Sequence, residues 1–306
     1  MNSNNDMNEA EKKQYGTRGY SIVDLLIEGE VLDYRNKIDR LLVPQARDDS
    51  GPAGKRNSAF QHFGDEFTAF NHEPRHYYFH LMTNYGTQPL HKLMLNEKMR
   101  GLVESLLGEK LILNNFSLLA AEPGIDYTQG WHRDIIQIPE NEIDDRIFSP
   151  GWHHNNTQFN LALYPDGCFW AVPGSHRRPD TPGEARAFGG SKHYSPIEAD
   201  MPGGIRIPLK PGQAIFYNNN LIHRGYSVNL AEPRRTLHLG FHSALRPPTW
   251  HFYLLNAERF TPEYLDSLDP EIRSMIDEYL LLRGKYPRME DTWPRPGRPL
   301  SDVLAR

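Results

Sequence analysis

The chain has 306 residues, of which 38% are hydrophobic and 24% are charged, a balance that excludes a disordered or fibrous protein. The net charge of −5 provides no basic surplus for nucleic acid or for an anionic membrane surface. The single cysteine, Cys168, excludes an intrachain disulfide and a cysteine-based zinc site.

The chain begins without an apolar leader segment, and no apolar run approaches the ~20 residues that cross a bilayer. We therefore expect a soluble, cytoplasmic protein. The length is enough for one domain with a substantial core. Within it we expect a disordered start (1–14), N-terminal helical support (15–107), a β-rich core (108–245), and a C-terminal helical extension with a tail (246–306).

Hydrophobic periodicity and turn residues predict the elements in chain order. A strand is predicted at 19–23, and helices are predicted at 29–42 and 89–107. After Gly108, short apolar runs between turn residues predict antiparallel strands closed into a sandwich or barrel. They fall at 110–120, 129–138, 157–164, 168–172, 205–209, 213–223 and 234–242. A Pro/Gly-rich loop occupies 176–206, and a last helix follows the capping residue Asp269, with Pro270 in its first turn.

The segment His72-Glu73-Pro74-Arg75-His76 matches a zinc-hydrolase pattern. That chemistry needs both histidines one helical turn apart, with the glutamate beside the metal-bound water. Pro74 disfavours helical geometry at Glu73, and the preceding residues form no amphipathic helix. A turn with surface histidines is the simpler interpretation, and a zinc hydrolase using His72 and His76 stays as an alternative.

A second histidine motif, His132-Arg133-Asp134, is a weak signal alone, and the residues around it favour a metal site. On a strand, residues i and i+2 point to the same face, so His132 and Asp134 present an imidazole and a carboxylate to one side. The best third ligand is His223, which ends the run 214–222 that follows the turn signal Pro211-Gly212. Two histidines and one carboxylate on one face of an octahedral ion leave three positions open, which is the facial triad of non-haem Fe(II) oxygenases. Two open positions suit a 2-oxo acid, and the third suits O2.

A 2-oxo acid with a second carboxylate also needs a fixed cation. If residues 234–241 form a strand antiparallel to one ending at His223, their side chains separate into two faces. The bulky face consists of Arg235, Leu237, Leu239 and Phe241, and the small, polar face consists of Arg234, Thr236, His238 and Gly240. The polar face suits a ligand cavity, so Arg234 is predicted to bind a carboxylate through its planar guanidinium. The alternative is a pair of solvated arginines on an edge strand.

Together these segments resemble the phytanoyl-CoA dioxygenase family of Fe(II)/2-oxoglutarate oxygenases. The run Gln129-Gly130-Trp131-His132-Arg133-Asp134 is similar to the family's Q-x-W-H-x-D segment. Residues 173–176 (PGSH) and 210–216 (KPGQAIF) are similar to two further family segments, and the eleven residues from His223 to Arg234 match the family's spacing. Two departures are Gln213, where relatives carry Asp, and Gly225, where they often carry Ser.

The resemblance implies a mainly β fold with flanking helices, in which residues 108–245 form a double-stranded β-helix (a cupin-like jelly-roll barrel) with iron at its mouth. It implies His132, Asp134 and His223 as the iron ligands and Arg234 as the anchor for the distal carboxylate of 2-oxoglutarate. It also implies Asn160 and Gln129 as further contacts to this cosubstrate. The implied cofactors are Fe(II) and 2-oxoglutarate, with O2 as cosubstrate.

The activity that the resemblance implies is hydroxylation of an unactivated C–H bond of a bulky small molecule, with release of succinate and CO2. Desaturation, cyclisation, epimerisation and endoperoxidation at the same centre stay open, as does a non-catalytic ligand-binding barrel. Related halogenases have a small residue at the position of Asp134, so the carboxylate argues against halogenation. Neither nucleic acid nor a membrane is expected as a partner. The sequence fixes neither the substrate and its binding residues nor the oligomeric state.

Overall fold

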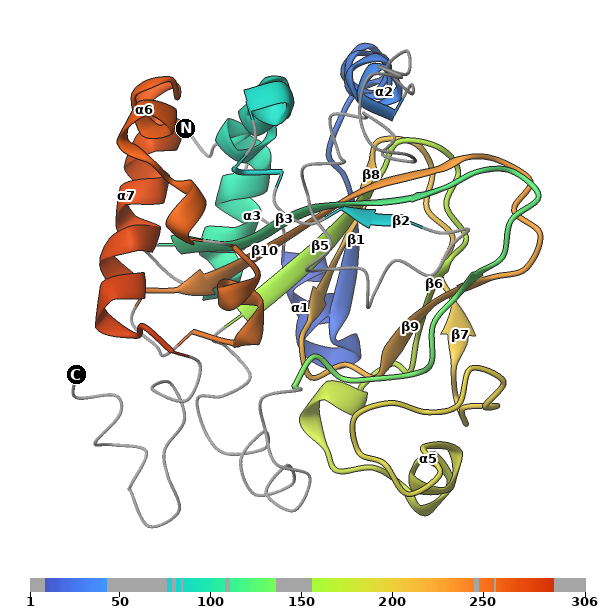
Figure 1. Cartoon of the computed structure of the whole chain (residues 1–306). Coiled ribbons are helices and arrows are strands. Elements are labelled where there is room, and N and C mark those ends of the chain that lie inside the picture. The colour runs from blue at the N-terminus through green and yellow to red at the C-terminus, as the bar shows by residue number, and fades with distance from the viewer. Residues whose placement is uncertain are drawn as a thin grey trace, which may run out of the picture.

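The computed structural model describes residues 9–42, 76–78, 81–83, 85–107, 111–135, 156–244, 248–255 and 257–288. Two sheets lie at the centre of these residues, with helices beside the larger sheet (Figure 1). The larger sheet has the order β1 (Tyr20–Asp24), β8 (Gln213–Asn218), β5 (Asn156–Ala162), β10 (Arg234–Ser243), β3 (Leu111–Ala121) and β2 (His76–Tyr78). The smaller sheet has the order β4 (Tyr127–Thr128), β9 (His223–Ser227), β6 (Phe169–Ala171) and β7 (Ile205–Arg206).

Neighbouring strands pair antiparallel in both sheets. The chain passes repeatedly from one sheet to the other: β8 in the larger sheet is followed by β9 in the smaller sheet and then by β10 in the larger one. This is the jelly-roll arrangement of a double-stranded β-helix, which the described strands leave open rather than closed into a barrel. The predicted fold class is confirmed.

The strand β10 lies inside the larger sheet, between β5 and β3. Leu237, Leu239 and Phe241 belong to the hydrophobic core that the sheet shares with the helices. Thr236 and His238 alternate with them and point to the other side, which we call the inner face. The predicted alternation is therefore confirmed. The two arginines at the start of β10 are buried within the sheet rather than solvated at an edge.

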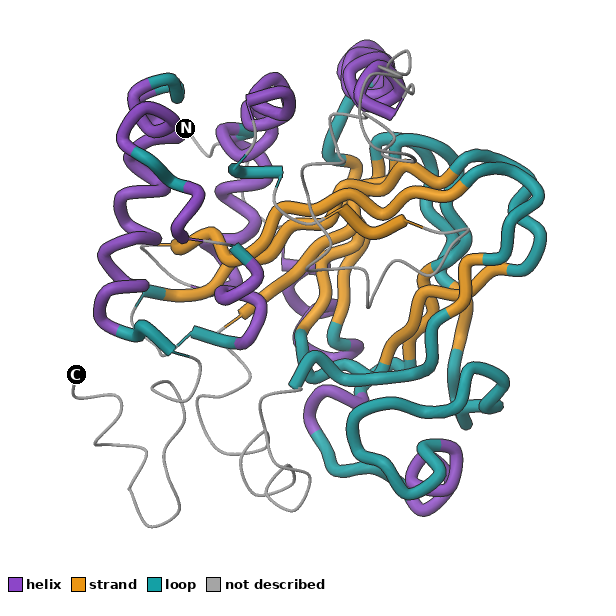
Figure 2. The backbone as a smooth tube through the Cα atoms, viewed as in Figure 1, coloured by secondary structure: helices purple, strands orange, loops and turns teal. Residues whose placement is uncertain are grey.

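The longer helices flank the larger sheet, and α3 and α7 both contact β3 (Figure 2). They are α1 (Glu9–Arg18), α2 (Glu28–Leu42), α3 (Glu97–Leu107) and α7 (Pro270–Lys285), and the 3-10 helix η3 (Tyr85–Leu95) precedes α3. Shorter helices are η6 (Ser175–Arg177), α5 (Pro182–Ala187), η7 (Trp250–Leu254), η8 (Ala257–Arg259) and α6 (Pro262–Asp266). In the part of the chain that the structure describes, no helix has the length and apolarity to span a membrane.

Two helix predictions need correction. Residues 9–14, expected in a disordered start, belong to α1, because Tyr15 is buried there and donates a hydrogen bond to Thr157 Oγ1 of β5 at 3.0 Å. This long-range contact leaves no periodic pattern in the sequence. The helix predicted at 89–107 is two helices, because Asn96 interrupts it and its Oδ1 accepts a hydrogen bond from Met99 N at 2.9 Å. The helices predicted at 29–42 and after Asp269 are confirmed.

Two strand predictions were also wrong in detail. The run 213–223 is not one strand: β8 ends at Asn218, a turn follows, and His223 begins β9 in the smaller sheet. In the described part of the segment predicted at 129–138, only an isolated bridge forms at His132, which pairs with His223 and with Tyr194 of the 176–206 loop. The remaining strands predicted between 110 and 242 are found, some of them shorter than predicted.

Candidate metal centre

The three predicted ligands, His132, Asp134 and His223, come together at the inner face. Each residue offers one possible ligand atom, and these three atoms lie within 4.8 Å of one another. All three residues are buried. Nε2 of His132 is 3.7 Å from Asp134 Oδ1, and Nε2 of His223 is 3.3 Å from Asp134 Oδ2. His132 N donates a hydrogen bond to His223 O at 2.9 Å, and His223 N donates to His132 O at 3.0 Å. This single bridge sets the two imidazoles side by side without a regular strand at His132.

Both imidazoles are held with Nε2 toward Asp134. His132 Nδ1 is 2.9 Å from Gly130 O, and His223 Nδ1 is 2.9 Å from Leu221 O. A carbonyl oxygen only accepts, so each Nδ1 donates and each Nε2 keeps the lone pair that a metal needs. Burial lowers the pKa of His223 to about 4. The ring is therefore neutral near pH 7, which is the protonation state of a metal ligand.

The carboxylate of Asp134 is held by neutral donors. Gln158 Nε2 donates to Asp134 Oδ2 at 2.5 Å and also contacts Asn219 Oδ1 at 3.1 Å. Burial raises the pKa of Asp134, although His132 and the hydrogen bond from Gln158 act in the opposite direction. A buried carboxylate is costly without an opposing charge, and a divalent cation supplies that charge. Two neutral imidazoles and one carboxylate form a donor set that suits a transition metal.

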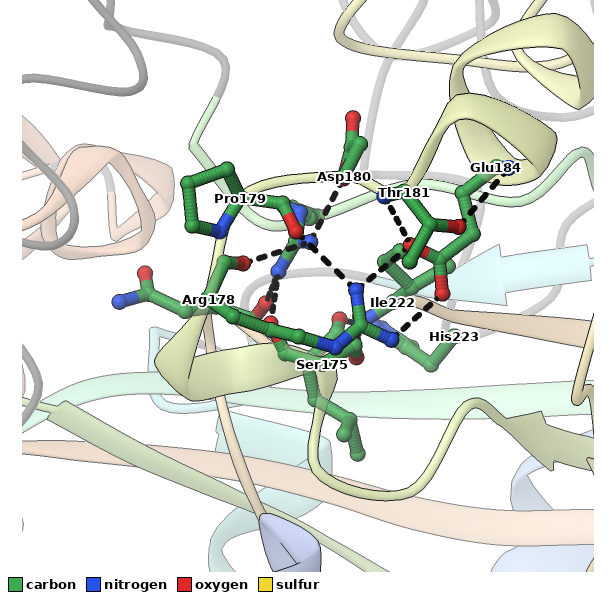
Figure 3. A network of polar contacts seen from close by, with 11 residues as sticks. Ser175, Arg178, Pro179, Asp180, Thr181, Glu184, Ile222 and His223 are labelled. Carbon is green, nitrogen blue, oxygen red and sulfur yellow. Dashed lines mark hydrogen bonds and ion pairs between the residues drawn. The ribbon is translucent and has the colours of Figure 1, made fainter.

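The two segments that carry the predicted ligands are joined through the short 3-10 helix η6, which follows β6. Arg133 Nη1 donates to Ser175 O at 2.8 Å, and Ile222 N donates to Ser175 Oγ at 2.9 Å. Figure 3 shows this network, which extends to the ion pair between Arg178 and Glu184, with two contacts of 2.7 Å. Ser175 of the PGSH segment thus contacts the residues that neighbour all three ligands, and it fixes the two segments relative to one another.

Arg234, predicted to bind a carboxylate, points to the inner face at the start of β10. Its Nε donates to Asp166 Oδ2 at 3.0 Å, and its guanidinium lies 4.0 Å from the centre of the Tyr127 ring. Burial alone lowers the pKa of Arg234, but the Asp166 carboxylate raises it overall, so the side chain stays a cation. Its Nη1 is buried and meets no hydrogen-bond acceptor among the described residues. A buried carboxylate on a ligand is the acceptor that this N–H group lacks.

The neighbouring Arg235 points to the opposite side. Its Nε lies 3.2 Å from Asp39 Oδ1 of α2, and its Nη2 lies 2.6 Å from Glu122 Oε1. The two arginines therefore have different partners, and only Arg234 lies on the side of the predicted metal ligands.

Asn160 and Gln129 also lie at this face. Asn160 pairs with His238 across β5 and β10, and its Oδ1 accepts from His238 Nδ1 at 2.7 Å, which leaves Nδ2 as the group it can offer to a ligand. Gln129 lies beside Gly225, since a β-carbon placed on Gly225 would be 3.5 Å from Gln129 Oε1. The same β-carbon would be 2.7 Å from the ring of Tyr127. Glycine at position 225 therefore gives the Tyr127 ring room to cover Arg234.

Four residues around the trio were not predicted from the sequence. His251 of η7 has its Nε2 3.7 Å from Asp134 Oδ1, and Tyr194 stacks on His132 with ring centres 4.9 Å apart. Gln158 contacts Asp134 as described above, and Asn219 O accepts a hydrogen bond from Asp134 N at 2.9 Å. The Asn-Asn-Asn run at 218–220 is a visible turn signal, but nothing in the run indicates contact with Asp134. His251 and Tyr194 lie in segments without periodic patterns, so no sequence signal identified them.

The zinc-hydrolase alternative loses its structural basis. His76 begins strand β2, whereas the chemistry of that motif requires its two histidines on one helix. His72 lies outside the described residues.

A buried set of two histidines and one carboxylate that could hold a metal ion, with a buried arginine on the same face of a jelly roll, is the arrangement typical of non-haem metal-dependent oxygenases. The family model of Phytanoyl-CoA dioxygenase (PhyH) matches residues 10–236, and the chain therefore belongs to this family. It is an Fe(II)/2-oxoglutarate-dependent oxygenase.

Solved structures with the same fold are distant in sequence. AviO1 from Streptomyces viridochromogenes Tue57 is 17% identical with a TM-score of 0.54, over 78% of this chain and 96% of AviO1. HygX from Streptomyces hygroscopicus, with nickel, 2-oxoglutarate and hygromycin B bound, is 16% identical with a TM-score of 0.53, over 78% and 89% of the two chains. SnoN, a non-haem α-ketoglutarate-dependent epimerase from nogalamycin biosynthesis, is 21% identical with a TM-score of 0.51, over 77% and 80%. No curated protein sequence gives a significant match.

Proposed function

We propose that this protein hydroxylates an unactivated C–H bond of a small organic molecule, with 2-oxoglutarate and O2 as cosubstrates and succinate and CO2 as coproducts. One observation carries the proposal: the buried His132–Asp134–His223 trio shares the inner face with the buried Nη1 of Arg234, which lacks an acceptor among the described residues. A dicarboxylic 2-oxo acid suits both features, because its oxo-acid end is a metal ligand and its distal carboxylate needs a cation.

In this proposal His132, Asp134 and His223 hold Fe(II), and Arg234 binds the distal carboxylate of 2-oxoglutarate. Asn160 and Gln129 contact the same cosubstrate. The iron with its cosubstrate supplies the oxidising chemistry, whereas the protein supplies binding, orientation and the exclusion of water.

The residues around Arg234 orient its guanidinium. Thr236 Oγ1 donates to Asp166 Oδ2 at 2.5 Å, and Cys168 N donates to Asp166 Oδ1 at 2.7 Å. The Asp166 carboxylate is thereby fixed, and it holds Nε of Arg234 in turn. This arrangement leaves Nη1 for a ligand and keeps the cation in place before the ligand arrives, which lowers the ordering cost of binding.

The residues around the metal ligands exclude bulk water. His132, Asp134 and His223 are 4%, 5% and 5% exposed. A dry site strengthens the electrostatic interactions within it and protects reactive species from side reactions. The substrate is a small molecule in this proposal. Because the similar structure of HygX holds hygromycin B, polar natural products are the first compounds to test.

The first test is an anaerobic titration of the protein with Fe(II) and then 2-oxoglutarate, monitored by the visible metal-to-ligand charge-transfer band. We expect a band that requires both components, followed by succinate release when O2 and a substrate are added. A protein that binds zinc and retains its activity with iron chelated would contradict the proposal. A protein that binds a small molecule but never forms succinate would instead be a non-catalytic binding barrel.

Product analysis tests the hydroxylation step. Hydroxylation adds one oxygen atom to the substrate, desaturation or ring closure removes two hydrogen atoms, epimerisation leaves the mass unchanged, and endoperoxide formation adds two oxygen atoms. A product without one added oxygen would replace hydroxylation by one of these outcomes, while the assignment of the iron centre and cosubstrate would stand.

A further inference from the structure

We propose that Asn114, Asn156 and His242 bind an uncharged, hydroxyl-bearing part of the substrate, so that this enzyme acts on a sugar, a glycoside or another neutral polyol. The three residues lie on the inner face, at the end of the larger sheet away from Arg234. This inference rests on the proposed function and names its substrate class.

The register of three neighbouring strands brings these residues together. β3, β10 and β5 lie side by side in the larger sheet (Figure 1). His242 follows His238 on β10, and alternate residues of a strand share a face, so both point to the inner face. Asn156 is the partner of His242 on β5. Arg234 begins β10, and its distance from His242 along the extended strand is roughly 26 Å.

A β-bulge and a glycine place the Asn114 amide on the same face. The pairing of β3 with β10 shifts by one residue after Gly240, which makes Asn114 an extra residue on β3. A β-carbon on Gly240 would point to the inner face and clash with Asn114 Oδ1. The amide therefore occupies the space that a side chain at position 240 would need, next to His242. Bulges beside active sites re-aim side chains in this way.

The polar atoms of these side chains include donors and acceptors without partners. Among the described residues, neither Oδ1 nor Nδ2 of Asn114 has a hydrogen-bond partner, and the same holds for both ring nitrogens of His242 and for Oδ1 of Asn156. Asn114, His242 and Asn156 are 0%, 0% and 2% exposed. Buried polar groups are normally hydrogen-bonded. Several of them on one face therefore indicate a ligand that supplies the missing partners.

The 3-10 helix η7 connects these groups with the metal centre. The Phe252 ring lies against the His242 ring, with centres 5.2 Å apart and an angle of 89° between the planes. The preceding residue, His251, has its Nε2 3.7 Å from Asp134 Oδ1. Adjacent residues of η7 thus contact His242 and a predicted metal ligand. In the proposed function the cosubstrate takes the side of Arg234, which leaves this side for the substrate.

The chemical character of the three side chains selects the ligand. Burial lowers the pKa of His242 to about 3, so the ring is neutral at pH 7. An amide and a neutral imidazole each present a donor and an acceptor, and a hydroxyl group also donates and accepts. A buried carboxylate or ammonium would need an opposite charge, which none of the three side chains carries. The geometry therefore favours hydroxyl groups.

Stability measurements separate a ligand site from a structural role. Replacing a buried polar group that lacks partners by an apolar group of similar size removes a desolvation cost, and such groups are retained where function requires them. We expect His242→Leu and Asn114→Leu each to raise the thermal midpoint by about 2 °C or more. His91→Leu is the matched control, because His91 is equally buried but its Nε2 is 2.7 Å from Leu81 O. The control should lower the midpoint.

Binding measurements test the substrate class. Anaerobic calorimetry, with Fe(II) and 2-oxoglutarate present, compares a set of neutral mono- and disaccharides and their phenyl glycosides with gluconate and glucosamine. We expect wild type to bind at least one neutral compound in preference to the two charged ones. His242→Leu and Asn114→Leu should bind it at least about tenfold more weakly, and His91→Leu should bind it as wild type does. If His242→Leu fails to fold, His242→Phe serves instead.

The result can contradict the inference in two ways. Absence of binding by every neutral compound, or equal binding by the charged ones, would overturn it. Loss of stability in both the His242 and the Asn114 variant, as in His91→Leu, would show that the groups are structural and would also overturn it. All variants should keep the charge-transfer band with Fe(II) and 2-oxoglutarate. A wild-type protein without this band would instead overturn the proposed function.

Discussion

Replacing Arg234 by methionine tests the assignment of the cosubstrate anchor. The substitution removes the cation and leaves Asp166, a carboxylate with 3% side-chain exposure, without its ion-pair partner. Breaking a buried ion pair in this way costs about 3–5 kcal/mol of unfolding free energy. The distal carboxylate of 2-oxoglutarate loses its charged partner as well, at a cost of about 2–5 kcal/mol of binding free energy. That corresponds to a Kd raised at least roughly thirtyfold.

The effects on stability and on cosubstrate binding can be separated, because Arg234 forms its ion pair with Asp166. Arg234→Met combined with Asp166→Asn removes the pair as a unit, and we expect its unfolding free energy to return to within about 1–2 kcal/mol of wild type. The double variant still lacks the cation, so its cosubstrate affinity should stay as low as that of Arg234→Met. Urea unfolding measures the first quantity, and the anaerobic Fe(II)/2-oxoglutarate titration measures the second.

Arg235→Met is the matched control. Arg235 points away from the inner face, and its partners Asp39 and Glu122 have side chains that are 43% and 63% exposed. Screened pairs of this kind contribute about 0–1 kcal/mol each, and neither contacts the site. We expect cosubstrate affinity close to wild type. If Arg235→Met weakened 2-oxoglutarate binding while Arg234→Met bound it normally, the assignment of the two faces of β10 would be refuted.

Three further predictions follow from the geometry. His132→Ala and His223→Ala should each abolish Fe(II) binding in anaerobic calorimetry, and retained binding would reject that residue as a ligand. Gly225→Ser places a β-carbon 2.7 Å from the Tyr127 ring and should destabilise the fold by about 1–3 kcal/mol. In a Tyr127→Ala background Gly225→Ser should cost less stability than in wild type, and an equal cost in both backgrounds would contradict the clash. Burial lowers the pKa of His91 from 6.5 to about 4, so the unfolded chain binds its proton first as the pH falls. Stability should therefore decrease from pH 6.5 toward pH 4 by about 1.4 kcal/mol per unit from His91 alone. Urea unfolding of His91→Asn at pH 6.5 and 5 should show a correspondingly smaller slope, and an unchanged slope would show that His91 is not neutral in the fold.

The parts of the fold that sequence reasoning predicted correctly are those with a regular pattern. The alternation along 234–241 predicted both faces of β10, and capping residues predicted the start of the helix after Asp269. The helix α1 was missed because its support is a single tyrosine that reaches a strand far away in the chain. The run 213–223 was interpreted as one strand because apolar residues resume at Leu221 and Ile222 directly after the turn at 219–220, and these two are as deeply buried as the apolar residues of β8.

In the candidate site, too, residues with a recognisable sequence pattern could be predicted and the others could not. The grouping of His132, Asp134 and His223, with Arg234 on the same side, was predictable because spacing and residue type together constrain these residues, within a pattern that resembles a known family. Gln158, Asn219 and His251 were not predictable, since each is a common polar residue whose role depends on which distant segment it meets. The structure supplies this information through backbone pairing, as in the bridge that joins His132 to His223.

The predicted metal ligands and Arg234 lie at the first residues of strands or in a segment that forms no regular strand. His223 and Arg234 are the first residues of β9 and β10, and His132 and Asp134 lie in a segment with only an isolated bridge. Inside a sheet, hydrogen bonds on both sides fix the backbone, and alternate side chains belong to the core. At strand starts and turns the backbone is free to adopt the geometry that aims an imidazole or a guanidinium inward. Such freedom has to be restrained by other contacts, and here Ser175, Asn219 and Asp166 supply them, so we expect the site to depend on these supporting residues as well as on the predicted ligands and Arg234.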